Sequence, residues 1–276
     1  ASSHTVTIEA ENENDKVEVT FENVNIDASS GNKAAVSVTG KGDTNIELNG
    51  DNKLKGGDRH AGLEHNQTVD SEGNVTSGKL TIQDDKDNAG SLTATGGYFG
   101  AGIGGGSAKA GQVTITGGTI TAISGDGAGI GGGQGNMGSN AGNADIEISG
   151  GTIEATGGDL SAGIGGGTWG DANIKITGDA VIKNATGGAF GAGIGGGGGG
   201  NGDVTISGNA KIDNVQGGTF GAGIGGGIYG IGNVTIKDNA TIGTVTGDAY
   251  GAGIGGGYAA LGDVTIEGNV TIKNAQ

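Results

Sequence analysis

The chain has 276 residues, including 69 glycines, no proline and no cysteine. A formal net charge of −16 disfavours nucleic acid and anionic membranes as partners, and no apolar run is long enough to span a bilayer. The lack of proline excludes collagen-like and proline-rich structures, and the lack of cysteine excludes disulfides and thiol chemistry, as in many proteins that bacteria export.

Residues 1–78 contain several short runs in which apolar and polar residues alternate, as in half-buried strands. Val17, Val19 and Phe21 form one such run, and turn-forming sequences separate it from the next. Residues 64–78 are polar, and we expect them to form a loop that leaves the main body. Because the region lacks the glycine repeat described next, residues 1–78 are predicted to be atypical coils that cap a repeat stack.

From residue 79 onward the chain repeats a pattern in which an isoleucine lies within a run of glycines. The first clear copy spans 100–106 and reads GAGIGGG. A fixed period indicates a repeat protein in which each unit packs on the next, so residues 79–276 are predicted to form regular coils of the same continuous domain. The isoleucine recurs at Ile103, Ile130, Ile164, Ile194, Ile224 and Ile254, and the last three steps are each 30 residues.

Each repeat contains three short strand candidates in a constant order. A pair of β-branched residues comes first, a second apolar run follows after a turn, and the glycine run comes last. Three strands per coil, stacked on their copies, define an all-β parallel β-helix with about 30 residues per coil and neighbouring coils about 4.8 Å apart. The first pairs are Val113/Ile115, Ile146/Ile148, Ile174/Ile176, Val204/Ile206, Val234/Ile236 and Val264/Ile266.

Residues four positions before the repeated isoleucine are mostly apolar, and in an extended chain they share its face. We expect them to form a buried aromatic column, while the intervening glycines form a bare face that allows another backbone to approach closely. Asparagines at regular intervals are expected to stack at a corner of the coil. The aromatic column is Phe99, Leu160, Phe190, Phe220 and Tyr250, and the asparagine column is Asn184, Asn214 and Asn274, with Thr244 between them.

Several segments, read together, resemble a known family. They are 17–26 (VEVTFENVNI), 34–38 (AAVSV), 45–50 (NIELNG), 78–82 (GKLTI), 90–94 (GSLTA) and the GAGIGGG runs. Over nearly its whole length the chain is similar to the clostridial (Firmicute) cell-surface carbohydrate-binding β-helix family, whose characterised relatives bind polygalacturonate. The resemblance implies a right-handed parallel β-helix that is secreted or wall-attached, is not an enzyme and binds calcium. The long, regular series of glycine repeats departs from the family, so no ligand site is carried over.

Three aromatic residues lie outside the aromatic column, shortly after glycine runs: Trp169, Tyr229 and Tyr258. Trp169 and Tyr229 have the same offset from their isoleucines, two coils apart, which predicts a separation of about 10 Å along the axis. Rings spaced in this way suit stacking on the apolar faces of successive sugar rings. The alternative is that the rings pack over the glycine turns as local covers.

A cluster of acidic and amide side chains directly follows a predicted strand. Carboxylate and amide oxygens gathered in one turn are the ligands that calcium prefers. Calcium would also link an acidic polysaccharide to a protein of net charge −16, which otherwise repels it. The candidate ligands are Asp84, Asp85, Asp87 and Asn88.

No arrangement of residues predicts catalysis. Glycan-cleaving β-helices need a general base or paired carboxylates in a groove. Here Arg59 is the only arginine, and the adjacent Asp84 and Asp85 would point apart in an extended segment. The histidines and the acid between them match no compact zinc pattern and are expected to lie in a solvated turn. These three residues are His60, Glu64 and His65.

The leading hypothesis is a bacterial cell-surface module that binds a polysaccharide or host glycan without cleaving it, with calcium assisting where the glycan is acidic. The alternative is a structural or adhesive stalk that binds a host surface protein or self-associates through its glycine face. Both hypotheses place the protein outside the cell, secreted or wall-attached, with no nucleic-acid partner and no membrane insertion.

Overall fold

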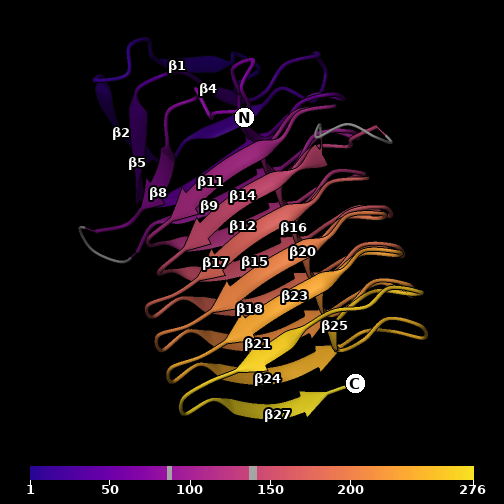
Figure 1. The fold of residues 1–276 in the computed structure, drawn as a ribbon. Helices are drawn as coiled ribbons and strands as arrows, with labels where there is room; N and C mark the ends of the chain where they lie inside the picture. The colour runs from indigo at the N-terminus through magenta and orange to yellow at the C-terminus, as the bar shows by residue number, and fades with distance from the viewer. Residues whose placement is uncertain (86–88, 137–141) are drawn as a thin grey trace.

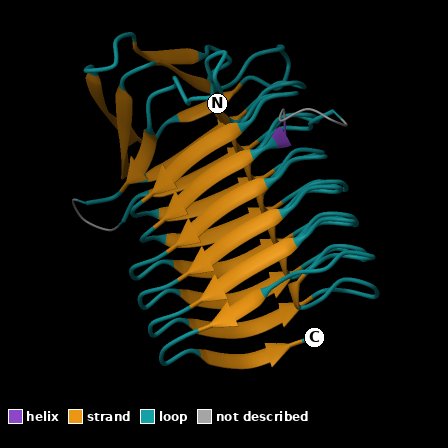
Figure 2. Ribbon diagram, viewed as in Figure 1, coloured by secondary structure: helices purple, strands orange, loops and turns teal. Residues whose placement is uncertain are grey.

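The chain folds into one elongated stack of coils, with the N-terminal coils at one end and the C-terminal strand at the other (Figures 1 and 2). The computed structural model describes residues 1–85, 89–136 and 142–276. These residues form 27 β-strands in three sheets of nine strands, and each strand pairs in parallel with its counterpart in the next coil. The predicted right-handed parallel β-helix with three strands per coil is confirmed.

Sheet 1 contains the third strand of each regular coil, and these strands are only two residues long. In the first three coils the corresponding strands are longer, because they lack the glycine run. In spatial order sheet 1 comprises β1 (Val6–Ala10), β4 (Val36–Gly40), β7 (Leu63–His65), β10 (Ile103–Gly104), β13 (Ile130–Gly131), β16 (Ile164–Gly165), β19 (Ile194–Gly195), β22 (Ile224–Gly225) and β25 (Ile254–Gly255).

Sheets 2 and 3 contain the longer strands that the paired β-branched residues and the following apolar run predict. Sheet 2 comprises β2 (Lys16–Glu22), β5 (Asp43–Asn49), β8 (Leu80–Gln83), β11 (Gly111–Ile115), β14 (Ala144–Ile148), β17 (Ala172–Ile176), β20 (Gly202–Ile206), β23 (Gly232–Ile236) and β26 (Val264–Ile266). Sheet 3 comprises β3 (Asn25–Asp27), β6 (Asp51–Lys55), β9 (Ser91–Thr95), β12 (Thr119–Ile123), β15 (Thr152–Thr156), β18 (Val181–Thr186), β21 (Lys211–Gln216), β24 (Thr241–Thr246) and β27 (Thr271–Ala275).

Columns of aliphatic side chains fill the space between the three sheets. In sheet 1, Ile164 pairs with Ile194 and Ile194 with Ile224, and all three are buried. The regular coils add such residues from all three sheets, and each buried aliphatic side chain contributes about 1.5–3 kcal/mol by leaving water. The isoleucine columns predicted from the 30-residue period are therefore confirmed as the core.

The glycine run bends sharply after its isoleucine, so it does not continue as a strand. Gly195 has a φ of +141°, and the equivalent glycines of the other regular coils lie between +128° and +137°. This left-handed region is strained for any residue with a Cβ. The chain then folds back, and Ala192 N–H donates to the carbonyl of Gly196 (2.9 Å).

The glycine face is buried inside the stack, and the predicted bare surface is wrong. A Cβ added at Gly191 would lie 2.1 Å from the carbonyl oxygen of Ser161, and one at Gly195 would lie 1.9 Å from that of Gly225. Both glycines are buried. The glycines allow neighbouring coils of the same chain to approach closely, so this face does not offer a route to self-association.

Two kinds of connection lie on opposite sides of the stack. Short turns join sheet 2 to sheet 3 on one side, and the longer loops on either side of the sheet 1 strands project on the other (Figure 1). The asparagine column lies within sheet 3 rather than at a corner, on exposed strand positions beside a register shift between Ile153 and Glu154. There the Asn184 side chain donates to Glu154, and that of Asn214 donates to Asn184.

The segment predicted as a polar loop, residues 64–78, begins as a strand. Glu64 and His65 belong to β7 and are buried, so the expected solvated turn is wrong for both. Both ring nitrogens of His65 lie within hydrogen-bond distance of carbonyl oxygens, those of Val38 (3.2 Å) and Gly78 (2.9 Å). Burial lowers the pKa of His65, although these two contacts act in the opposite direction. The remaining residues of the segment leave the coil as predicted.

The last coil leaves its apolar edge open. Val264 and Ile266 in β26 are exposed, whereas the equivalent Val234 and Ile236 of the preceding coil are buried. Among the described residues no helix has the length and apolar character needed to cross a membrane.

Candidate functional site

The aromatic column lies on the surface of the projecting loops, so its predicted burial is wrong. Phe190 and Phe220 are half-buried and Tyr250 is exposed. Their rings stack along the coil axis with centroids 5.2 Å apart and planes within 9° of parallel. The reason is local: the sheet 1 strand is too short to include these positions, which occupy the turn before it and face outward.

The three aromatics proposed for sugar stacking lie in the neighbouring loops and join this column. Tyr258 packs edge-on against both Phe220 and Tyr250, with centroids 5.7 and 5.6 Å apart. The ring centroids of Tyr229 and Tyr258 lie 6.0 Å apart. We call this continuous apolar surface the crest. It consists of Leu160, Trp169, Phe190, Phe220, Ile228, Tyr229, Tyr250 and Tyr258.

Trp169 and Tyr229 are held in the left-handed backbone region, each with a φ of +59°. The equivalent residue in the coil between them is Gly199, with a φ of +85°. A bulky residue in this region costs about 1–2 kcal/mol, which glycine avoids. Ala108 and Ala259 occupy the same position in other coils, each with a φ of +57°, so the left-handed conformation belongs to the loop and is not confined to the two aromatic residues.

A slot of about 290 Å³ opens between Trp169 and Tyr229. The intervening coil has Gly198 and Gly199 at the two positions that Ile228 and Tyr229 fill in the next coil, so it adds no side chain there. One edge of the Trp169 ring rests over Gly199, where an added Cβ would lie 2.2 Å from Cε3. The lining residues are Leu160, Thr168, Trp169, Phe190, Gly198, Ile228 and Tyr229.

Backbone hydrogen bonds between adjacent coils fix the position of the loops that form the crest. Gly198 N–H donates to the carbonyl of Leu160 (2.7 Å), and Ile228 N–H donates to that of Phe190 (2.9 Å). Trp169 N–H donates in turn to the carbonyl of Gly198 (2.9 Å). These bonds satisfy the backbone polar groups, so the slot offers a ligand mainly side-chain surface. Tyr229 is 61% exposed and Trp169 38% exposed, which leaves part of each ring open to solvent.

The loops that form the crest carry no positive charge. Residues 157–171, 187–201, 217–231 and 247–262 contain no lysine, arginine or histidine. Their ionisable acids are Asp159, Asp171 and Asp248. The electrostatic field at the crest therefore arises from acids, within a chain of net charge −16.

Of the proposed calcium ligands, Asp84 and Asp85 follow β8, on the side of the stack where sheet 2 turns into sheet 3 and away from the projecting loops that carry the crest. Asp87 and Asn88 lie outside the described residues. Asp84 is 2% exposed; its Oδ2 accepts from Gly90 N–H (2.9 Å), and its Oδ1 has no hydrogen-bond partner among the residues that the structure describes. Asp85 N–H donates to the carboxylate of Glu47 (3.2 Å). Among the described residues no group of three or more acidic or histidine side chains is arranged to hold a metal ion.

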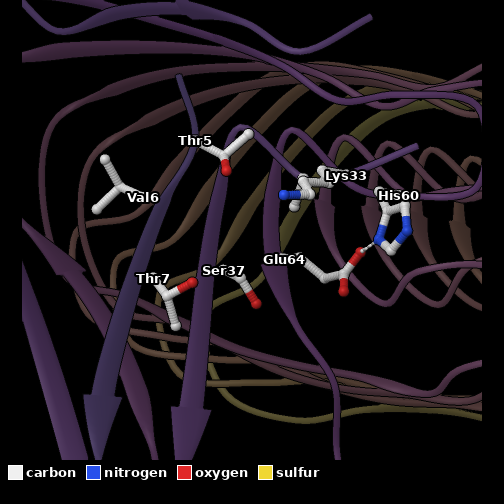
Figure 3. Close-up of a pocket in the computed structure, with 8 residues that line it drawn as sticks. Thr5, Val6, Thr7, Lys33, Ser37, His60 and Glu64 are labelled. Atoms are coloured by element: carbon white, nitrogen blue, oxygen red, sulfur yellow. Dashed lines mark hydrogen bonds and ion pairs between the residues drawn. The ribbon is translucent and has the colours of Figure 1, made fainter. Parts of the chain in front are cut away.

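A polar pocket of about 250 Å³ lies on the outer face of sheet 1 in the first coils (Figure 3). Glu64 accepts hydrogen bonds there from Ala61 N–H (3.2 Å) and the Asn66 amide (3.1 Å), and its carboxylate lies 2.8 Å from His60 Nδ1. The sequence analysis did not predict the contact between His60 and Glu64. The signal for it was a His and a Glu four residues apart on either side of a glycine. With three partners inside the chain, Glu64 acts as a structural acceptor that fixes the turn.

Comparison with known proteins places the chain in a fold class. A family model described as a beta helix repeat matches residues 88–107, 113–134 and 146–168. These segments coincide with consecutive coils of the stack. The fold and the matched repeats together define a parallel β-helix protein. No curated protein and no solved structure matches the chain.

Proposed function

We propose that the protein is a non-catalytic bacterial cell-surface module, secreted or wall-attached, that binds a polysaccharide or host glycan through the crest. The observation that carries the proposal is the slot between Trp169 and Tyr229, two aromatic residues with Gly198 and Gly199 in the coil between them. Aromatic rings that line an open cleft suit the apolar faces of sugar rings. The resemblance to carbohydrate-binding β-helix proteins agrees with this role.

A glycan array probed with the purified chain tests the proposal. We expect binding to a restricted set of glycans and a loss of about tenfold in affinity for Trp169→Ala, because one stacking surface is removed. Tyr98→Ala is the matched control, since Tyr98 is exposed but lies outside the crest. Equal binding by all three proteins would count against the slot, and a lack of binding to any glycan would count against the function.

Calcium belongs to the proposal as a structural ion rather than a bridge to the ligand. The support is Asp84, whose buried Oδ1 has no hydrogen-bond partner in the described part of the chain and is costly unless a cation or a proton satisfies it. We expect calcium to raise the unfolding midpoint and Asp84→Asn to remove that rise, with Asp85→Asn as the neighbouring control. An unfolding midpoint that does not respond to calcium would exclude this part of the proposal.

An adhesive role toward a host surface protein is the second candidate. Apolar side chains beside the crest favour it: Leu261 is 85% exposed and Ile231 is 47% exposed. Large exposed apolar surfaces mark protein contacts as well as ligand grooves. Retention of a host protein that survives Trp169→Ala but not Leu261→Asp would support this role over glycan binding.

A further inference from the structure

We infer that the crest selects an uncharged glycan and rejects uronates, an inference that rests on the proposed glycan-binding function. It names the ligand class of that site and departs from the acidic polysaccharide expected from the sequence. Three observations carry it: the charges around the slot, the position of the calcium candidates, and the polar groups that the slot offers.

The loops around the slot contain no cationic side chain that could pair with a polyanion. The four loops that form the crest have no cationic side chain, and Asp159 immediately precedes Leu160 in the slot wall. A uronate carboxylate that enters an apolar slot loses hydration without gaining a counter-ion, which is unfavourable. The overall charge of −16 adds a longer-range repulsion that salt weakens.

A bound calcium ion at the candidate residues could not remove this repulsion. Asp84 follows β8 on the side of the stack where sheet 2 turns into sheet 3, whereas the crest lies on the side of the projecting loops (Figure 1). The two also belong to different coils, because the slot spans the coils of β16, β19 and β22. A cation near Asp84 therefore cannot contact a ligand that lies between Trp169 and Tyr229.

The slot itself offers apolar walls with a few neutral polar groups. Thr168 is 4% exposed, and its hydroxyl lies 3.5 Å from that of Ser161. Trp169 and Tyr229 also line the slot, and their side chains carry two further neutral polar groups, an indole N–H and a phenol. Neutral sugars present C–H faces to rings and hydroxyls to such groups, so the chemistry of the lining matches an uncharged ligand.

Matched polysaccharide pairs that share a backbone and differ in charge test the inference. Methyl-esterified homogalacturonan is compared with polygalacturonate, and hydroxyethylcellulose with carboxymethylcellulose, beside neutral mannan, xylan and β-1,3-glucan. Affinity electrophoresis is run with calcium, with EDTA, and at low and high salt. We expect binding to a neutral glycan that is at least about tenfold tighter than to its charged counterpart and that does not respond to calcium or EDTA.

Gly198→Ile provides the sharpest variant, because it fills the slot without removing a ring. Ile228 occupies the equivalent position in the next coil, so the loop accepts this side chain. We expect the neutral glycan to bind at least about tenfold more weakly, with an unchanged unfolding midpoint. Tighter binding would instead indicate nonspecific apolar adsorption and would overturn the inference. Ile123→Leu, at an exposed isoleucine outside the crest, serves as the control.

The possible failures are distinguishable. Calcium-dependent binding to the uronates alone would overturn the inference and leave glycan binding intact. A lack of retention by every polysaccharide would overturn the proposed function and the inference with it. Equal binding to both members of each pair would show that the crest does not discriminate by charge, and would also overturn the inference.

Discussion

The loops beside sheet 1 carry different side chains in the two halves of the stack. In the N-terminal half they include Arg59, Lys109 and Asp126, whereas in the C-terminal half they carry the crest and no cation. Asp126 occupies the position that Phe190 and Phe220 fill later. The difference shows that the coils supply a constant scaffold, while the chemistry varies in the loops from one coil to the next.

The two halves also differ at the residue where the chain leaves sheet 1. Ser37 and Glu64 are in register with Gly104 and its successors, and Ser37 points outward into the polar pocket of the first coils. In the regular coils the chain turns back at this position with a positive φ. A side chain is therefore allowed where the strand continues, and glycine is required where the loop folds back.

The largest expected effect comes from placing a side chain in the glycine column. Gly195→Ala combines a φ of +141° with a Cβ 1.9 Å from a backbone oxygen, so we expect a loss of about 3 kcal/mol or more. Urea unfolding monitored by circular dichroism measures it. Ser37→Ala at the equivalent position should cost under about 1 kcal/mol. Gly73→Ala, with a φ of +87° and open space, separates strain from collision. Similar losses of unfolding free energy for all three variants would contradict the proposed difference between the two halves.

Glu64 should be the most important polar side chain of the N-terminal half. Glu64→Ala leaves the buried Ala61 N–H without its acceptor and removes the contact with His60, so we expect a loss of about 2–3 kcal/mol in unfolding free energy. Glu9→Ala, an exposed acid of β1, is the control and should be nearly neutral. A loss for Glu64→Ala no larger than that of the control would show that the turn is held by other contacts.

His65 should make the N-terminal half sensitive to acid. Its pKa is lowered in the folded chain because burial disfavours the charged ring. The unfolded chain therefore binds the proton more readily, so stability is full above the unfolded value of 6.5 and falls as the pH drops below it toward the folded pKa. We expect His65→Gln to flatten the unfolding free energy between pH 7 and about pH 5. An unchanged slope would exclude His65 as its source.

The smallest expected effect concerns Asp126, the acid in the aromatic column. Burial, and then the charge of Asp159, raise the pKa of Asp126 above its usual 3.8, and a hydrogen bond from Tyr98 opposes them in part. With a raised folded pKa, the carboxylate contributes stability only at low pH and loses it as the pH rises. Asp126→Asn should therefore gain a few tenths of a kcal/mol at pH 7 and little at pH 3, as measured by urea unfolding. A gain that is the same at both pH values would contradict this account.

The repeat made the scaffold predictable, because the isoleucine period and the paired β-branched residues fix the register of the three sheets. The loops were harder to predict. In an extended chain Phe190 would lie on the same face as Ile194. The strand is only two residues long and begins at Ile194, so Phe190 lies outside it and the alternation of strand faces does not determine where its side chain points. The slot depends on Gly198 and Gly199, whose importance appears only when three coils are stacked.

Because the described loops form their hydrogen bonds within a coil and with the adjacent coils, a coil is close to an interchangeable unit. Insertion or removal of one 30-residue repeat would add or delete one coil and leave the register of the other coils intact. The length of the binding surface, and the order of its side chains, could then change in whole steps without any need to rebuild the interior.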